Sequence, residues 1–267
     1  IGYQTRPDLF ALEIVRPELL YADVAEVPER LNADGSVLVP LDVDAVRAAL
    51  QSGYDAGLRA VAVALLHAYL NPDHEVRVAK IATDIGFTQI STSHQVSRLA
   101  KLVGRGDTTV VDAYLSPILR RYVDRVAHAL DVGRVCERLF FMQSSGGLTD
   151  AGRFQGRDAI LSGPAGGIVG MVKTAQAAGH DQLIGFDMGG TSTDVSHYAG
   201  DYERSFETEV AGVRMRAPMM DIHTVAAGGG SICRFADGRF QVGPESAGAN
   251  PGPACYRRGG PLTVTDS

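Results

Sequence analysis

The chain has 267 residues, enough to bury the core of one large domain or of two smaller ones. Its 45% hydrophobic and 21% charged residues exclude an intrinsically disordered chain. The net charge of -6 excludes a global basic field that would attract nucleic acid or an anionic membrane, and the longest apolar run, residues 60–66, is too short to cross a bilayer.

The first 143 residues predict an α/β arrangement. Short strands are expected at residues 24–27, 36–39, 59–66, 89–91 and 139–143. Helices are expected at residues 42–51 and 72–85. The turn from Asn32 to Gly35 separates the first two strands, and Gly86 ends the second helix. The order strand, helix, strand over residues 59–91 predicts a parallel pair with a right-handed crossover.

A long helix is expected over residues 108–130, with Pro117 kinking or delimiting it. Before this helix, polar residues together with Gly104 and Gly106 interrupt the apolar pattern. We therefore expect a boundary between two parts of the chain within residues 92–105. Beyond the long helix, strands, glycine-rich turns and helices alternate.

The most informative motif runs from Leu183 to Val195. An apolar strand leads into Asp187, then into Gly189 and Gly190, and a second strand follows at residues 195–198. Glycines allow backbone N–H groups to turn around an anion without interference from Cβ atoms. The segment therefore predicts a hairpin whose tip can hold a phosphate.

Polar side chains in this turn favour a phosphate site over a plain glycine hairpin, because a tight turn alone does not require Asp187, Thr191, Thr193 and Asp194 together. The two threonines can donate hydroxyl hydrogen bonds, and Asp187 can hold a hydrated Mg²⁺ or position a water. The absence of Gly-Lys-Ser/Thr and of GxGxxG excludes a Walker loop and a dinucleotide fingerprint. The phosphate-binding candidates are Gly189, Gly190, Thr191 and Thr193, and the catalytic candidates are Asp187, Thr191 and Asp194.

Two further glycine clusters are candidate nucleotide contacts. Residues 162–167 precede a helix expected at 168–178, with Ser162 as its N-cap, so Gly166 and Gly167 would lie at its positive end. Small residues for close helix packing are the alternative there. The run from Gly228 to Gly230 favours close approach of a ligand over a flexible hinge.

Two other groups leave alternatives open. Asp221 and His223 lie two residues apart on an expected strand and could hold a metal, although a structural hydrogen bond is the commoner role of such a pair. Cys255 is either a nucleophile or an ordinary thiol. The three cysteines cannot close as pairs and lack metal-ligand spacing, so we expect a cytoplasmic protein.

The order strand, DxGGT turn, strand resembles the phosphate hairpin of the actin, sugar kinase and heat-shock ATPase superfamily, whose lobes are ribonuclease H-like. That fold holds a nucleotide between two such hairpins, one from each lobe. This chain has a single DxGGT stretch, at residues 187–191. The resemblance therefore implies α/β lobes that are incomplete at both ends of the chain.

Five blocks resemble the hydantoinase A/5-oxoprolinase family, and its oxoprolinase branch most closely. They are FMQSSGGL at 141–148, LSGPAGGIVG at 161–170, GFDMGGTSTDV at 185–195, HTVAAGGGSI at 223–232 and VGPESAGANPGPACY at 242–256. The resemblance implies that residues 1–95 end the family's N-terminal domain and that residues 96–267 begin its hydantoinase A domain. A first DxGGT hairpin is expected before Ile1, so the chain is expected to be an internal fragment.

The activity that this resemblance implies is the ATP- and Mg²⁺-dependent opening of a cyclic amide, 5-oxo-L-proline giving L-glutamate through a phosphorylated amide. Related alternatives are a hydantoin or N-methylhydantoin amidohydrolase and a ketone carboxylase subunit. A different class is a non-catalytic actin-like ATP-binding module. Asp187→Asn or Gly190→Val in the whole protein is expected to abolish turnover without unfolding it.

The expected partners are a small cyclic amide, and either a second copy of the chain or a hydantoinase B-type domain or subunit. No nucleic acid or membrane partner is expected, since the chain carries net negative charge. The 267 residues alone are expected to be essentially inactive, because half of the phosphate clamp would be missing.

Overall fold

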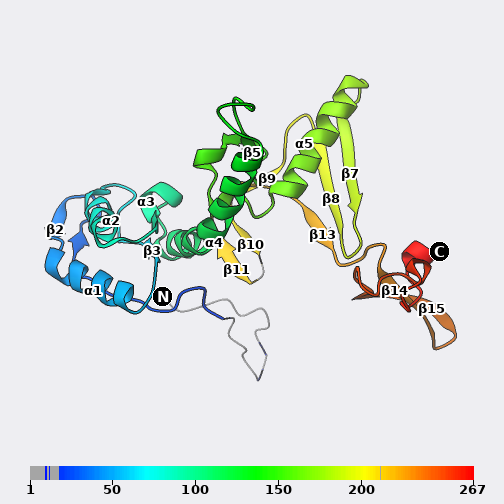
Figure 1. Cartoon of the computed structure of the whole chain (residues 1–267), viewed down its shortest axis with the longest axis horizontal. Coiled ribbons are helices and arrows are strands. Elements are labelled where there is room, and N and C mark those ends of the chain that lie inside the picture. The colour runs from blue at the N-terminus through cyan, green and yellow to red at the C-terminus, as the bar shows by residue number, and fades with distance from the viewer. Residues whose placement is uncertain (1–9, 11, 13–17, 211) are drawn as a thin grey trace. The chain divides into compact units, whose positions relative to one another are not determined.

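A computed structural model describes residues 10, 12, 18–210 and 212–267 and has a mixed α/β fold (Figure 1). The chain divides into two compact units, which are described separately. Unit 1 comprises residues 1–143, 147–160 and 205–218, and unit 2 comprises residues 144–146, 161–204 and 219–267. These units follow spatial contacts, and the boundary between residues 95 and 96 stays a prediction. In the part of the chain described, no helix combines the length and the apolar character needed to span a membrane.

Unit 1 opens with two short antiparallel strands, β1 (Arg30–Leu31) and β2 (Val37–Val39). The predicted turn between them is confirmed, since the Gly35 amide donates to the Asn32 carbonyl at 2.9 Å. The strand predicted at residues 24–27 is wrong, because the turn sets the register and pairs β2 with the residues immediately before Asn32.

The predicted parallel pair is confirmed. Strand β3 (Ala60–Val63) pairs in parallel with β4 (Gln89–Thr92), after helix α1 (Val43–Asp55) and around helix α2 (Asp73–Ile85). The Asp42 side chain accepts from the Ala45 amide and caps α1, and Gly86, at φ 114°, ends α2. Apolar side chains of these elements form the core of the unit, Leu41, Val46, Val63, Val78 and Ile81. The handedness of the crossover stays a prediction.

Helix α4 (Leu102–Ala129) is longer than its predicted range and continues through Pro117. Gly104 and Gly106 lie inside this helix, near its start, and do not separate it from another element. The boundary expected within residues 92–105 stays a prediction. A Cβ atom at Gly104 would lie 2.5 Å from Cδ of Arg216 in the same unit. This glycine therefore permits the close packing of a helix, and does not end one.

A polar network with Glu75, Ser93 and Arg105 fully buried at its centre ties the ends of β3 and β4 to the helices. The carboxylate of Glu75 accepts hydrogen bonds from the Leu65 amide, the Ser93 hydroxyl and the His94 amide, at 2.5 to 2.9 Å. The Arg105 guanidinium donates to the same hydroxyl at 2.8 Å and to three backbone carbonyls, those of Leu65, Leu99 and Ala100. Burial lowers the pKa of Arg105, and the charge of Glu75 opposes that shift.

The remaining elements of unit 1 are short. They are α3 (Ser93–Val96), β5 (Phe140–Met142), β6 (Leu148–Asp150), β10 (Thr208–Val210) and β11 (Val213–Met215), with 3₁₀ turns η1 (Ala151–Arg153) and η2 (Gly156–Asp158). Strand β5 lies within the range predicted for it at residues 139–143.

Unit 2 is built around a three-stranded antiparallel sheet with helix α5 (Ser162–Ala177) against it. The strand order is β13 (His223–Val225), β8 (Thr193–Ala199), β7 (Gln182–Met188). The other elements are β9 (Arg204–Ser205), β12 (Met219–Met220), the hairpin of β14 (Ser231–Ala236) and β15 (Arg239–Ser246), and the 3₁₀ turns η3 (Ala254–Tyr256) and η4 (Val264–Asp266).

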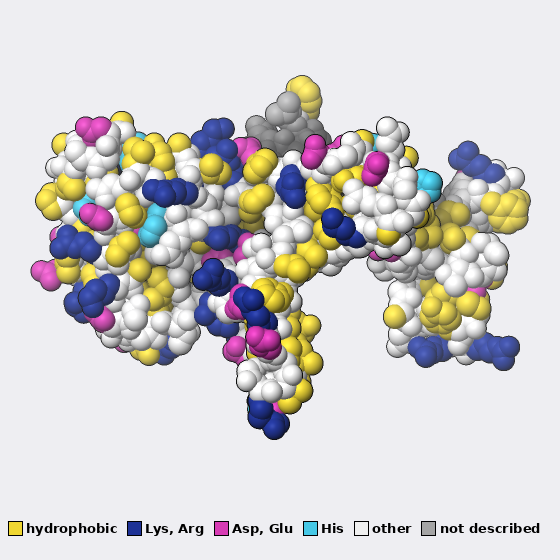
Figure 2. Space-filling model, turned by 90° about the horizontal axis from the view of Figure 1, so that it is seen from above, with side chains coloured by type: hydrophobic (Ala, Val, Ile, Leu, Met, Phe, Trp, Pro, Cys, Tyr) yellow, Lys and Arg dark blue, Asp and Glu magenta, His cyan; other side chains and the backbone are white. Residues whose placement is uncertain are grey.

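Charged side chains of both signs are spread over the molecular face in Figure 2. On that face, Lys and Arg side chains lie among acidic and apolar ones and do not gather into one basic region. This mixture of signs on one face agrees with the net charge of -6.

Candidate functional site

The predicted hairpin at residues 183–198 is confirmed. Strands β7 and β8 pair along their whole length, from Gln182↔Ala199 to Met188↔Thr193. Residues 189–192 form the tip, which is closed by a 2.9 Å hydrogen bond from the Gly189 amide to the Ser192 carbonyl. Asp187 and Asp194 stand directly opposite each other across the two strands. The hairpin therefore places a pair of carboxylates just below a glycine-rich tip.

Three consecutive backbone N–H groups at the tip, those of Gly190, Thr191 and Ser192, have no hydrogen-bond acceptor among the described residues. A Cβ atom at Gly190 would meet nothing within 4 Å, so the space beside it is open. Successive amides that face open space can bind an anion such as a phosphate.

The orientation of these amides has a structural cause. The carbonyls of Gly189 and Gly190 accept hydrogen bonds from the amides of Gly229 and Gly230, at 2.9 and 2.7 Å. In a trans peptide the N–H points away from the C=O of the same unit. The Gly190 and Thr191 amides therefore point away from the Gly228–Gly230 segment.

The two threonines predicted to contact phosphate differ in their surroundings. Thr191 is exposed at the tip. Thr193 is only 3% exposed, and its hydroxyl donates to the Ala227 carbonyl at 2.6 Å. A bond of that length holds the hydroxyl to the backbone, so Thr193 serves to attach the loop after β13 to the hairpin.

The backbone of Gly228–Gly230 lies close against the hairpin tip, whereas the sequence predicts that this segment lies close to a ligand. A Cβ atom at Gly228 would lie 2.7 Å from the Gly189 carbonyl oxygen and 2.8 Å from the Thr191 nitrogen. At Gly230 it would lie 2.7 Å from the Gly190 carbonyl oxygen. Backbone packing thus accounts for these glycines, and contact of this segment with a ligand stays a prediction.

We expect Gly228→Ala to destabilise unit 2 by about 1–3 kcal/mol, the usual range for overpacking against atoms that cannot move aside. The added methyl group would push the loop off the hairpin tip and weaken the two hydrogen bonds beneath it. Thermal unfolding measures the loss. Gly243→Ala is the matched control, because a Cβ atom there meets nothing within 4 Å. Equal melting temperatures for the two variants would contradict this packing.

The helix predicted at residues 168–178 begins earlier than expected. Helix α5 starts at Ser162, so Gly166 and Gly167 lie inside it, and the N-cap position belongs to Leu161. The prediction of Ser162 as N-cap is wrong, because Ser162 is already helical and the N-cap position belongs to Leu161. The Leu161 amide donates to the hydroxyl of Ser144, 17 residues earlier, at 2.9 Å.

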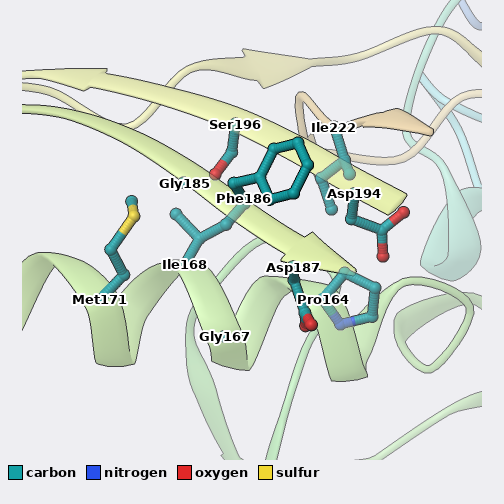
Figure 3. A pocket seen from close by; sticks show the side chains of 10 residues that line it. All are labelled: Pro164, Gly167, Ile168, Met171, Gly185, Phe186, Asp187, Asp194, Ser196 and Ile222. Atoms are coloured by element: carbon teal, nitrogen blue, oxygen red, sulfur yellow. The ribbon is translucent and has the colours of Figure 1, made fainter. Parts of the chain in front are cut away.

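A pocket of about 260 Å³ lies between α5 and the sheet (Figure 3). One face of α5 and the facing strands line it with Pro164, Gly167, Ile168, Met171, Gly185, Phe186, Asp187, Asp194, Ser196 and Ile222. In Figure 3 the two carboxylates lie at the end near Pro164, and Met171 lies at the other end. The pocket thus has an acidic end and an apolar end.

The two carboxylates are held differently. Asp187 is exposed, whereas Asp194 is half-buried and accepts a 2.7 Å hydrogen bond from the Thr224 hydroxyl on β13. Mg²⁺ is usually bound by one or two carboxylates together with waters and substrate phosphates. The exposed Asp187 therefore fits a Mg²⁺ ion that a nucleotide shares, and the site does not form an all-protein cage.

The metal alternative for Asp221 and His223 gains no support. Asp221 lies outside β13, and its amide donates to the Glu203 carbonyl at 3.0 Å. Within the described ranges, no group of three His, Cys, Asp or Glu residues could hold a metal ion.

Cys255 is exposed and lies against a carboxylate. Its thiol hydrogen-bonds to Asp266, and this interaction raises the thiol pKa. The Asp266 carboxylate also accepts from the amides of Ala254, Cys255 and Thr263 at 2.8 to 3.1 Å, and these bonds hold its pKa well below the usual range. A thiol with a raised pKa is a poor nucleophile, so the ordinary role of Cys255 is favoured.

We expect Asp266→Asn to speed alkylation of Cys255 by iodoacetamide at pH 8. The pKa of a free thiol is about 8.5, and Asp266 favours the protonated form that does not react. Mass spectrometry of the Cys255 peptide measures the rate, with Cys136 and Cys233 as internal controls. A slower or unchanged rate at Cys255 alone would contradict the effect of the carboxylate.

Two family models match the chain. The Hydantoinase/oxoprolinase model matches residues 105–267, and the model of the Hydantoinase/oxoprolinase N-terminal region matches residues 1–86. The chain is 45% identical to 5-oxoprolinase 1 of Arabidopsis thaliana over its whole length, which is 23% of that protein. It thus spans about a quarter of the length of such relatives.

Two solved structures have a similar fold. The ATP-dependent caprolactamase from Pseudomonas jessenii superposes with a TM-score of 0.77 and 36% identity over 90% of this chain and 36% of that one. The alpha subunit of the same caprolactamase is 38% identical over 89% of this chain and 35% of its own length. A nucleotide-free acetone carboxylase superposes with a TM-score of 0.72 and 26% identity over 90% of this chain and 35% of that one.

Proposed function

Because the chain belongs to the hydantoinase/oxoprolinase family, we propose that it is the ATP-handling part of an enzyme that hydrolyses a cyclic amide. The substrate proposed is 5-oxo-L-proline and the product L-glutamate. The 45% identity to 5-oxoprolinase 1 supports this choice, and the ATP-dependent caprolactamase supports the use of ATP on a lactam.

The observation that carries the proposal is the hairpin tip, where the amides of Gly190, Thr191 and Ser192 have no acceptor among the described residues and the space beside Gly190 is open. These three N–H groups would bind oxygens of the terminal phosphoryl group of ATP. Asp187 would hold the Mg²⁺ of the nucleotide, which neutralises charge during the transfer.

The fold proposed for unit 2 is an actin-like, ribonuclease H-like lobe. The antiparallel β7–β8–β13 sheet with α5 against it supports this assignment. The other phosphate hairpin of such a fold would come from sequence outside these residues, and the cleft between the lobes would hold the nucleotide.

The chemistry overcomes the low reactivity of a five-membered lactam. The amide oxygen attacks the γ-phosphorus, an O–P bond forms, the bond from phosphorus to the β,γ-bridging oxygen breaks, and ADP leaves. The ring carbon of the resulting phosphorylated amide is more electrophilic than before. Water then adds to this carbon, and the C–N bond breaks with proton transfer to nitrogen, which leaves an acyl phosphate and a free amine. A second water hydrolyses the acyl phosphate, so that phosphate leaves and the open-chain amino acid remains.

The test uses the complete protein that contains this chain, together with any partner subunit. We expect ADP to form with 5-oxo-L-proline and L-glutamate to appear in equal amount. ATP cleavage with hydantoin that yields an N-carbamoyl amino acid would identify a hydantoinase. Nucleotide-driven assembly without turnover would identify a mechanical ATP-binding module, and either result would overturn the oxoproline assignment.

A ketone carboxylase subunit is a second candidate, because the acetone carboxylase superposes over 90% of the chain. Bicarbonate-dependent ATP cleavage with acetone would identify it.

For both candidate functions we propose a cytoplasmic enzyme that works with a second copy of itself or with a hydantoinase B-type domain or subunit. The three free cysteines support the cytoplasmic location. The name of the caprolactamase alpha subunit supports a partner subunit.

A further inference from the structure

We infer that the pocket between α5 and the β7–β8 hairpin binds the ring of the cyclic amide, with Asp194 accepting the hydrogen bond of the ring N–H. This inference rests on the proposed function and gives the substrate its own position beside the nucleotide. It assigns a role to Asp194, Thr224 and Gly167, which lie on three different elements of unit 2.

The volume of the pocket suits the ring. At about 260 Å³ it has room for one small ring, and it lies below the roughly 300–1,000 Å³ of pockets that hold drug-sized ligands. The two compounds would occupy neighbouring places, the nucleotide at the hairpin tip and the ring beneath it.

The lining of the pocket suits a neutral ring that carries a hydrogen-bond donor. Ile168, Met171 and Phe186 supply an apolar wall, while Asp187 and Asp194 supply acceptors at one end. No lysine or arginine is among the described residues that line it. A substituent carboxylate is therefore not recognised inside the pocket, and it would stay on the solvent side near the exposed Gly167, away from the two aspartates.

Asp194 is the better placed acceptor, because the 2.7 Å hydrogen bond from Thr224 fixes its orientation. When the amide oxygen attacks phosphorus, positive charge develops on the ring nitrogen. A carboxylate already oriented toward the N–H stabilises that charge more strongly in the transition state than in the ground state. Thr224 is accordingly a positioning residue that acts through Asp194.

The pocket also lies within reach of the tip. Asp187 lines the pocket, and Gly190, whose amide faces open space, follows it by three residues. Three residues of extended chain cover at most about 10 Å. A ring held at the acidic end would therefore present its oxygen toward a phosphoryl group bound at the tip.

Two glycines of α5 allow a matched test. Gly167 lines the pocket and Gly170 does not, yet a Cβ atom at either position meets nothing within 4 Å. Valine at 167 would occupy the pocket without displacing the backbone, whereas valine at 170 would add the same side chain outside it. Helix propensity changes equally in the two variants, so any difference between them comes from the pocket.

The complete enzyme is assayed with 5-oxo-L-proline, 2-pyrrolidinone and ATP, and binding of the two lactams is followed by saturation-transfer NMR. We expect Gly167→Val to raise KM for 5-oxo-L-proline at least tenfold and to abolish the NMR signals, with KM for ATP unchanged. We expect Gly170→Val to stay within twofold of the unmodified enzyme in all three measurements.

Substitutions of Thr224 provide a second test of this inference. Thr224→Val should lower kcat about tenfold with little effect on KM for ATP, and Thr224→Ser, which retains the hydroxyl, should restore it. Normal lactam binding in Gly167→Val would overturn the pocket while leaving the proposed function intact. An enzyme that cleaves ATP with no cyclic amide would overturn the proposed function, and this inference with it.

Discussion

Gly190→Val is expected to reduce ATP-dependent turnover of the complete enzyme by at least about a hundredfold, the usual loss when one preorganised group of donors is removed. The valine side chain would fill the open space beside the tip amides, where the phosphoryl group is proposed to bind. No atom lies within 4 Å of the added Cβ, so the fold should be retained. Steady-state ATP cleavage measures the loss of turnover, and a melting curve measures whether the fold is retained.

Gly243→Val is the control for this prediction. Gly243 also lies in unit 2, within strand β15, and a Cβ atom there meets nothing within 4 Å. Its substitution should leave turnover and melting temperature close to those of the unmodified enzyme. Near-normal turnover in Gly190→Val would remove the hairpin tip from the mechanism, and Asp187→Asn gives an independent check on the same hairpin.

Arg105→Met is expected to destabilise unit 1 by about 3 kcal/mol or more, because each buried acceptor left without its donor costs about 1–3 kcal/mol. Arg105 and Glu75 are both 0% exposed and share the Ser93 hydroxyl. Methionine matches the length of the side chain but removes the donor to the Ser93 hydroxyl, through which Arg105 reaches Glu75. It also leaves three backbone carbonyls without their guanidinium donors.

Thermal or urea unfolding measures this loss. Arg98→Met is the matched control, since Arg98 is exposed and makes one hydrogen bond, to the Tyr69 carbonyl at 3.2 Å. An exposed substitution of this kind usually changes stability by less than about 0.5 kcal/mol. Equal effects of the two substitutions would show that the buried network contributes little to folding.

Local patterns predict the elements of this chain well where a single segment determines its own structure. The parallel β3–β4 pair and the β7–β8 hairpin agree with their predicted ranges, because apolar runs and turn residues suffice to define them. The polar residues of the hairpin could also be identified from the sequence, although their roles stay predictions.

Predictions from the sequence are wrong where the structure around a residue depends on a contact with a residue far away in the chain. Helix α5 begins six residues before its predicted start because the Leu161 amide finds its acceptor at Ser144. Gly104 lies inside α4 because Arg216, 112 residues later, packs against it. The partners of such contacts cannot be deduced from a single sequence, which is also why Ser196, Ile222 and Thr224 were not identified in advance.

The packing of Gly229 and Gly230 beneath the hairpin tip has a further consequence. Each of the first two peptide planes of the tip is fixed by a hydrogen bond to its carbonyl. Rotation of either plane by half a turn would bring its N–H against the amide of Gly229 or Gly230 and leave two donors without an acceptor, at a cost of about 1–3 kcal/mol for each donor that is buried. The tip is therefore locked in one peptide orientation before any anion arrives, and binding requires no backbone rearrangement there.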